Sequence, residues 1–189
     1  MKDKEIKIKE CILKMYEELR SGMIKNWQRD LPFTEILFDR WERANKLGFG
    51  ENTSIYHNSY VYGDVKVGAN TWIGPFTILD GSGGLQIGDY CSISAGVHIY
   101  SHNSVMWALS GGKKEYEKSP VKIGDCCFIG PQSIISNGVT IGSHTVIGAN
   151  SFVNIDIPEH SIAFGTPIEI AGKVNISKTG DISFEYFKQ

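Results

Sequence analysis

The sequence predicts a mainly β protein whose short strands are wound into stacked parallel coils. Aliphatic residues recur every six positions, the next residue is often glycine, and the fourth residue after each aliphatic is small or β-branched. A helix would show a period near 3.6 and a half-buried strand a period of 2. A period of six fits a short strand followed by a tight corner, with the aliphatic side chain inward and glycine permitting the turn. Coils of this kind bury each other's apolar faces. The in-phase positions are Ile55, Val61, Val67, Ile73, Leu79, Ile87, Ile93, Ile99, Ile123, Ile129, Ile135, Ile141, Ile147 and Val153.

Two helices are expected ahead of the coils, in an N-terminal helical region spanning 1–50. Residues 3–20 carry apolar side chains at helical spacing with charges between them, which is typical of an amphipathic helix. Pro32 opens a second helical pattern, which keeps apolar residues on one side as far as Ala44 and ends at Gly48. An uncovered terminal coil would expose a strand edge, so we expect both helices to cap the open end of the stack.

The coils are interrupted twice. The run Asp-Gly-Ser-Gly-Gly at 80–84 adds two residues to one coil, and a longer insertion occupies 101–120. Long insertions in a compact repeat usually serve binding or assembly, and Trp107 makes this loop apolar enough to pack on a neighbouring subunit. A loop that only joins subunits is the alternative. The pattern predicts a β-helix domain over 51–172, including the inserted loop, and a C-terminal tail over 173–189.

Composition narrows the classes of partner. The chain is 41% hydrophobic and 21% charged, with a formal net charge of -2. Lysine and arginine are spread thinly, so we expect no nucleic-acid partner. No apolar stretch is long enough to cross a bilayer, and the charged N-terminus lacks the apolar centre of a signal peptide. We therefore expect a cytoplasmic protein without membrane insertion. The four cysteines match no zinc motif, which favours reduced thiols.

The repeat between residues 50 and 172 resembles that of the hexapeptide-repeat acyltransferases, such as galactoside and maltose O-acetyltransferases and the sugar acetyltransferases of polysaccharide biosynthesis. The resemblance implies a left-handed parallel β-helix with three hexads per coil, assembled as a homotrimer. It also implies an acetyltransferase that uses acetyl-CoA as co-substrate and no metal. The implied acceptor is a hydroxyl of a sugar or sugar-containing molecule, in surface polysaccharide biosynthesis. N-acetylation of a nucleotide-linked amino sugar stays an alternative, because no residue decides between oxygen and nitrogen.

His102 lies where the regular coil gives way to the insertion. Galactoside and maltose acetyltransferases carry their catalytic histidine at this position, within a Gly-His-Pro run that is replaced here by Ser101, His102 and Asn103. The resemblance therefore implies that His102 is the catalytic base. A sugar hydroxyl is a poor nucleophile near neutral pH, and an imidazole can accept its proton and later pass it to the departing thiolate.

Several side chains are candidates for the acceptor side of the site. Asp80 ends a run similar to one that carries acceptor-binding residues in the family. It could bind a sugar hydroxyl, orient His102, or be only a polar residue at a coil corner. Asn103 and Trp107 are further candidates for contact with the substrate. Weaker candidates are Asn103, Glu115 and Glu117 for orienting the imidazole, and Asn26, Trp27 and Asp30, which resemble a region that helps to form the acceptor pocket.

The resemblance also implies a coenzyme A site on the later coils. Phe128, Pro131 and Ala149 match positions that line the coenzyme A channel of galactoside acetyltransferases. A Thr-Lys pair that lies next to the pantetheine and phosphate of coenzyme A in the family is replaced here by Asn154 and Ile155. The family's terminal arginine, which touches a phosphate, has only Lys173 as a substitute, at a shifted position. The segment IAFGTPIEIAGKV resembles the one that closes the last coil in the family.

Three other functions fit the sequence less well. Carbonic anhydrases of the gamma class share the β-helix and bind zinc through one histidine and a pair five residues apart. Here His98 and His102 are four apart and occupy different hexad positions. Serine acetyltransferases have a larger helical part and a catalytic Asp-His motif that is absent here. A non-enzymatic scaffold would need no histidine beside a long loop.

Overall fold

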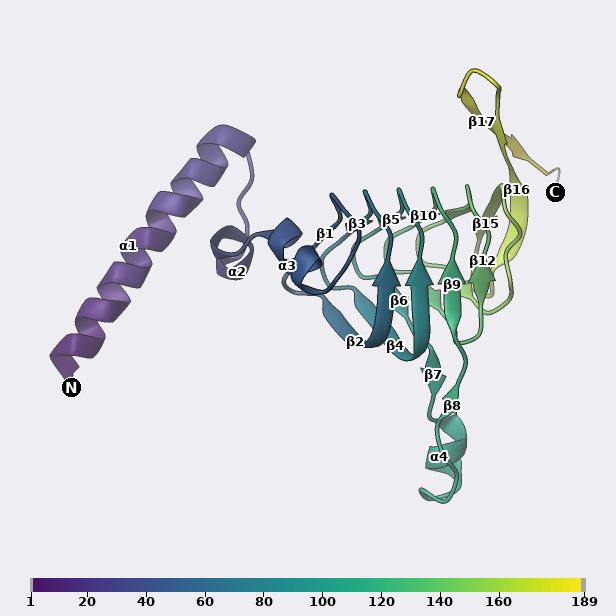
Figure 1. Ribbon diagram of the computed structural model, residues 1–189, viewed down its shortest axis with the longest axis horizontal. Coiled ribbons are helices and arrows are strands. Elements are labelled where there is room, and N and C mark those ends of the chain that lie inside the picture. The colour runs from purple at the N-terminus through teal and green to yellow at the C-terminus, as the bar shows by residue number, and fades with distance from the viewer. Residues whose placement is uncertain (1, 188–189) are drawn as a thin grey trace.

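A computed structural model describes residues 2–187 and shows a stack of parallel coils with helices at one end and a hairpin at the other (Figure 1). One loop projects sideways from the middle of the stack. The mainly β fold of stacked coils that the period of six predicted is confirmed. None of the helices within residues 2–187 has the length and the apolar character that crossing a bilayer requires.

The N-terminal region contains three helices instead of the expected two. The first is longer than the predicted 3–20, and the second helical pattern is divided in two. Phe38 is extended at the division, and the Asp39 carboxylate accepts the backbone N–H groups of Trp41 and Glu42, each at 2.8 Å. This N-cap begins a new helix and so prevents a continuous one. The helices are α1 (Lys2–Trp27), α2 (Phe33–Leu37) and α3 (Arg40–Lys46).

The helices α2 and α3 contact the first coil, where the Glu35 carboxylate of α2 accepts the Asn58 N–H at 3.1 Å. α3 packs against β1 (Ser54–Ile55), the first strand of the stack, whereas α1 contacts α2 and extends away from the coils in Figure 1. The Arg20 guanidinium donates two hydrogen bonds to the Asp30 carboxylate, at 2.7 and 2.6 Å, and ties α1 to the segment that follows it. The expectation that both helices cover the open end is therefore wrong for α1.

The coils have three faces, on which equivalent residues of successive coils stack. On the first face Ile55 pairs in register with Ile73, which pairs with Ile93; on the second face Leu79 pairs with Ile99. β2 and β4 are long because each continues through the corner from the second face to the third. The first face holds β1, β3 (Trp72–Ile73), β5 (Ser92–Ile93), β10 (Phe128–Ile129), β13 (Val146–Ile147) and β15 (Ser161–Phe164). The other faces hold β2 (Tyr60–Val67), β4 (Ile78–Ile87), β6 (His98–Ile99), β9 (Val121–Ile123), β11 (Ile134–Ile135), β12 (Thr140–Ile141) and β14 (Phe152–Val153).

The interior is aliphatic along the faces and polar at the corners. Most of the inward aliphatic side chains are fully buried. At one corner the Thr71 hydroxyl donates to the Gly88 carbonyl oxygen at 2.9 Å and accepts the Cys91 N–H at 3.0 Å. Such bonds pair backbone groups where the chain turns, which explains the small polar residue of each hexad.

Two segments leave the coils. The insertion predicted at 101–120 is an ordered loop, made of two paired strands with a short helix at the tip. Of the tail predicted over 173–189, residues 173–186 form part of an antiparallel hairpin that extends the first face, and residues 188–189 lie outside the described part of the chain. The loop contains β7 (His102–Asn103), α4 (Val105–Leu109) and β8 (Glu117–Lys118), and the hairpin contains β16 (Glu169–Ile176) and β17 (Ile182–Tyr186).

Candidate active site

His102 is the first residue of the projecting loop. It opens β7 directly after the coil has passed through β6, and it pairs with Lys118 of β8. Its side chain is 31% exposed, so one edge of the imidazole is accessible while the other faces the coils. A histidine at the root of a loop is thus fixed by the rigid stack on one side and open on the other.

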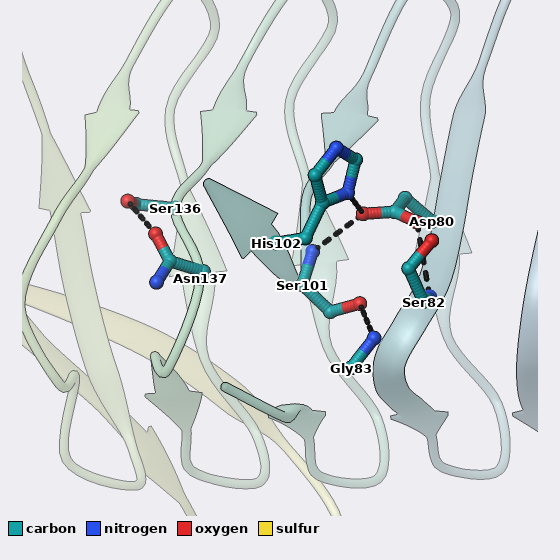
Figure 2. Close-up of polar contacts among 7 residues, drawn as sticks. All are labelled: Asp80, Ser82, Gly83, Ser101, His102, Ser136 and Asn137. Atoms are coloured by element: carbon teal, nitrogen blue, oxygen red, sulfur yellow. Dashed lines mark hydrogen bonds and ion pairs between the residues drawn. The ribbon is translucent and has the colours of Figure 1, made fainter. Parts of the chain in front are cut away.

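Asp80 holds the inner edge of this imidazole (Figure 2). Its Oδ2 lies 2.5 Å from His102 Nδ1 and accepts the Ser101 N–H at 2.9 Å, and its Oδ1 accepts the Ser82 N–H at 3.0 Å. Only 2% of Asp80 is exposed. The sequence left three interpretations of Asp80 open: binding a sugar hydroxyl, orienting His102, or being only a polar residue at a corner. In the structure Asp80 contacts the imidazole of His102.

The pKa of Asp80 lies below the ordinary value of an aspartate. Burial acts to raise this pKa, but hydrogen bonds from the hydroxyl and N–H of Ser82, from His102 and from the Ser101 N–H favour the charged form and outweigh burial. Asp80 is therefore a carboxylate at neutral pH. Because a carboxylate only accepts hydrogen bonds, Nδ1 of the neutral ring carries the hydrogen and the lone pair lies on Nε2.

A cavity of about 320 Å³ lies beside His102. Ser136 and Asn137 line it from the next coil, and the Ser136 hydroxyl donates to Asn137 Oδ1 at 3.3 Å (Figure 2). Sequence reasoning missed both residues. The signal was available, because Ile135 stacks on Ile99 and the residues after each must therefore be neighbours. The cavity is also lined by Tyr100, Asn103, Ser104, Ile134 and Phe152.

The loop brings two aromatic rings to the imidazole. Tyr116 stacks on His102 with ring centroids 5.9 Å apart and planes inclined by 26°. Trp107 meets Tyr116 edge-on, with centroids 5.5 Å apart. Tyr116 was absent from the residues that the sequence singled out. Trp107, expected at the substrate, lies one ring further from the imidazole than Tyr116.

The weaker candidates for orienting His102 have other contacts. Asn103 Oδ1 accepts the Val105 N–H at 2.8 Å, and its amide nitrogen lies 3.5 Å from a Glu117 carboxylate oxygen. Glu115 lines a second cavity within the loop. Asn103 still lines the cavity beside His102, as expected for a residue near the substrate. Of the N-terminal candidates, Trp27 lines an apolar groove that residues of α1, α2 and α3 form together.

The residues expected at coenzyme A do not form one pocket. Pro131 and Ala149 are exposed at the same corner of successive coils, where the Asn150 N–H donates to the Pro131 carbonyl oxygen at 2.9 Å. Phe128 is exposed on the first face and Asn154 follows β14 on the second. Lys173 lies in β16 and lines a separate cavity at the C-terminal end of the stack.

The remaining histidines are directed elsewhere. His98 Nδ1 lies 3.4 Å from the Tyr100 hydroxyl, so it does not share a partner with His102. His144 and His160 stack on each other at a corner, with centroids 4.9 Å apart. Within residues 2–187 no three His, Cys, Asp or Glu side chains lie where they could hold one metal ion.

The chain matches known proteins in sequence, mainly over the repeat, and in structure over most of its length. Residues 120–154 match the family model described as Bacterial transferase hexapeptide (six repeats). Galactoside O-acetyltransferase of Escherichia coli (strain K12) is 28% identical over 129 residues, 58% of this chain and 64% of that protein. The solved maltose O-acetyltransferase from Clostridium difficile 630 is 26% identical, with a TM-score of 0.56 over 88% of this chain and 89% of that one. AntD, an N-acyltransferase from Bacillus cereus solved in complex with dTDP and 3-hydroxybutyryl-CoA, is 22% identical, with a TM-score of 0.59 over 70% of this chain and 89% of that one.

These matches make the chain homologous to galactoside and maltose O-acetyltransferases, as its sequence predicted. The likeness to AntD concerns the fold alone. The chain aligns with less than two thirds of the length of the Escherichia coli relative.

Proposed function

We propose that the protein is an acetyl-CoA-dependent acetyltransferase that acts on a hydroxyl of a sugar or sugar-containing acceptor, with His102 as the general base. The observation that carries the proposal is the partly exposed imidazole of His102, hydrogen-bonded to the buried Asp80 beside a cavity, in a homologue of sugar O-acetyltransferases. A scaffold protein has no use for a buried carboxylate aimed at a histidine.

The chemistry follows from the tautomer that Asp80 imposes. His102 Nε2 takes the proton of the acceptor hydroxyl while the hydroxyl oxygen attacks the thioester carbonyl carbon. The resulting imidazolium gives that proton to the sulfur of coenzyme A as the carbon–sulfur bond breaks. Asp80 stabilises the imidazolium through a charge-assisted hydrogen bond. A base placed in this way accelerates such a reaction by about 10²–10⁴.

The tetrahedral intermediate carries an oxyanion that needs hydrogen-bond donors. The Ser136 hydroxyl and the Asn137 amide are on the cavity wall contributed by the next coil, and both can turn a donor toward the cavity. We assign the oxyanion to this wall. Loss of one such donor typically costs about 10²–10³ in kcat.

Coenzyme A is proposed to lie along the later coils, near Phe128, Pro131, Ala149 and Asn154. All four side chains are exposed, and the first three match positions of the coenzyme A channel in the related acetyltransferases. Lys173 could meet a phosphate only at the C-terminal end of the stack, because it lies in β16.

A homotrimer is part of the proposal. Val105, Trp107 and Leu109 of α4 are exposed on a loop that projects beyond its own coils (Figure 1). Exposed Ile134 and Phe152 line the open cavity beside His102. A neighbouring copy would bury these apolar groups and close the cavity, with one site at each subunit interface. A cytoplasmic location and a role in surface polysaccharide biosynthesis complete the proposal.

The test is turnover of acetyl-CoA by the purified protein with a panel of sugars, glycosides and nucleotide-linked amino sugars. His102→Ala should lower kcat by about 10²–10⁴ and leave the affinity for acetyl-CoA nearly unchanged. His98→Ala is the matched control, because this histidine is four residues away and is directed at Tyr100. If both variants lose activity equally and chelators abolish the activity of the wild-type protein, the reaction is metal-dependent and the proposed mechanism is wrong. Activity confined to amino sugars would favour N-acetylation.

A further inference from the structure

The loop that follows His102 is a built structure rather than a flexible insertion. Its strands pair His102 with Lys118 and Asn103 with Glu117. At its tip the Ser110 hydroxyl oxygen accepts the N–H groups of Lys113 and Lys114, at 3.1 and 2.9 Å. These contacts fix the backbone of the loop and therefore the positions of the side chains that it carries.

Tyr116, the residue before β8, lies over the ring of His102. Centroids 5.9 Å apart and planes inclined by 26° are within the range of offset-stacked aromatic pairs. Trp107 of α4 packs edge-on against Tyr116, with ring centroids 5.5 Å apart and planes inclined by 79°. The imidazole is therefore held at two places, by Asp80 at Nδ1 and by Tyr116 at its face.

A ring in this place favours the protonated imidazole. The face of an aromatic ring attracts a cation within about 6 Å of its centroid. The charged groups around His102 act in both directions: Asp80 of β4 accepts from it, while Lys118 lies opposite it in β8 with Glu117 next along the strand. Asp80 restrains rotation in the plane of its hydrogen bond, and Tyr116 restrains tilting of the ring out of that plane.

We propose that Tyr116 is a positioning residue for His102, which fixes the plane of the imidazole and stabilises its protonated form through the face of the phenol ring. Trp107 supports Tyr116 in this position. The proposal deepens the proposed function and rests on it only for the kinetic consequences, because the stacking itself exists without substrate.

The decisive experiment follows the imidazole directly, by NMR titration of isotope-labelled histidine, with the His102 signal assigned from the His102→Ala variant. Tyr116→Leu should lower the pH midpoint of the His102 titration by about 0.3–0.7 units. Tyr116→Phe keeps the ring and should leave the midpoint in place. Tyr186→Leu is the control, because Tyr186 is a similarly exposed tyrosine in the C-terminal hairpin. A midpoint that is the same in Tyr116→Leu and in the control overturns the proposal.

Kinetics give a second, separate measurement. In Tyr116→Leu we expect kcat to fall about 3- to 30-fold, an unchanged KM for acetyl-CoA, and an acidic limb of kcat/KM shifted to lower pH. Tyr116→Phe should restore all three, and equal loss in both variants would assign the effect to the hydroxyl and overturn the proposal. Trp107→Leu should reproduce the shift in the midpoint at smaller size. If the wild-type protein transfers no acetyl group, the proposed function is wrong, while the titration still decides the role of Tyr116.

Discussion

Replacing Asp80 with asparagine keeps the volume of the side chain and changes what its two terminal atoms can do. The carboxylate accepts hydrogen bonds from three N–H groups, those of His102 Nδ1, Ser101 and Ser82. Asparagine offers one oxygen and one NH₂ group. Whichever way the amide is turned, at least one of the three donors meets another donor in a place where only 2% of the residue is exposed.

The size of the effect can be worked from these contacts. A buried donor without an acceptor costs about 1–3 kcal/mol, which for a chain of this length lowers the melting temperature by about 2–12 °C. Loss of the charge-assisted bond to the imidazolium removes about 1.5–3 kcal/mol of transition-state stabilisation, or roughly 10- to 150-fold in kcat. If the NH₂ group faces Nδ1, the ring carries its hydrogen on Nε2 and is no longer a base, and the loss approaches about 10⁴.

Steady-state release of coenzyme A and thermal unfolding measure the two effects. Asp89→Asn is the matched control, because the exposed Asp89 carboxylate accepts the Ala69 N–H at 2.6 Å and an asparagine oxygen can replace it. We expect this control to retain its kcat. Wild-type kcat in Asp80→Asn, with only the stability reduced, would refute the reasoning and make Asp80 a structural residue of the coil corner.

Three further predictions concern assembly, cofactor and pH. Sedimentation at micromolar concentration should give a trimer, and a monomer would contradict the interface proposed around Trp107. Acetyl-CoA should raise the melting temperature of the wild-type protein, and Ala149→Phe, at an exposed corner, should abolish this shift without changing the melting temperature of the free protein. The pKa of Asp80 is lowered by folding, so its contribution to stability is present above the ordinary aspartate value of about 3.9 and is lost as the pH falls through the lowered value. The difference in unfolding free energy between wild type and Asp80→Asn, measured in urea, should therefore shrink from pH 7 to pH 3, and a constant difference would contradict this.

The coils could be predicted from sequence because the same contact repeats along the chain. Each inward aliphatic residue faces its equivalent in the next coil, as Ile55 faces Ile73, so the constraint recurs many times. The position of α1 could not be predicted in this way. Helical spacing in 3–20 indicates an apolar side, but the direction in which a helix leaves depends on contacts that occur once, such as that between Arg20 and Asp30.

The division between α2 and α3 had a signal in the sequence. Asp39 is followed three residues later by Glu42, a pattern typical of a helix N-terminus, and the Asp39 side chain does accept the Glu42 N–H. The continuous apolar spacing from Leu37 to Ala44 outweighed that signal in the prediction. The helix boundary at Asp39 is therefore set by a local capping hydrogen bond, although the apolar spacing continues across it.

The candidate site lies where two departures from the repeat coincide. In a regular coil the residues after Leu79 and Ile99 would both turn into exposed corners. β4 continues through its corner, as β2 does one coil earlier, and Asp80 is buried within it. The run at 80–84 that holds the two added residues also supplies the Ser82 N–H, which Asp80 accepts. The insertion at 101–120 diverts the chain just after Ser101, so that His102 lies over Asp80 instead of entering the next corner. Each departure alone reads as a tolerated irregularity. The stacking of Leu79 on Ile99 places Asp80 level with Tyr100, two residues before His102. Counting hexads across the interruption at 80–84 would therefore have brought the carboxylate near the imidazole, but the contact itself depends on the turn that the chain takes after Ser101.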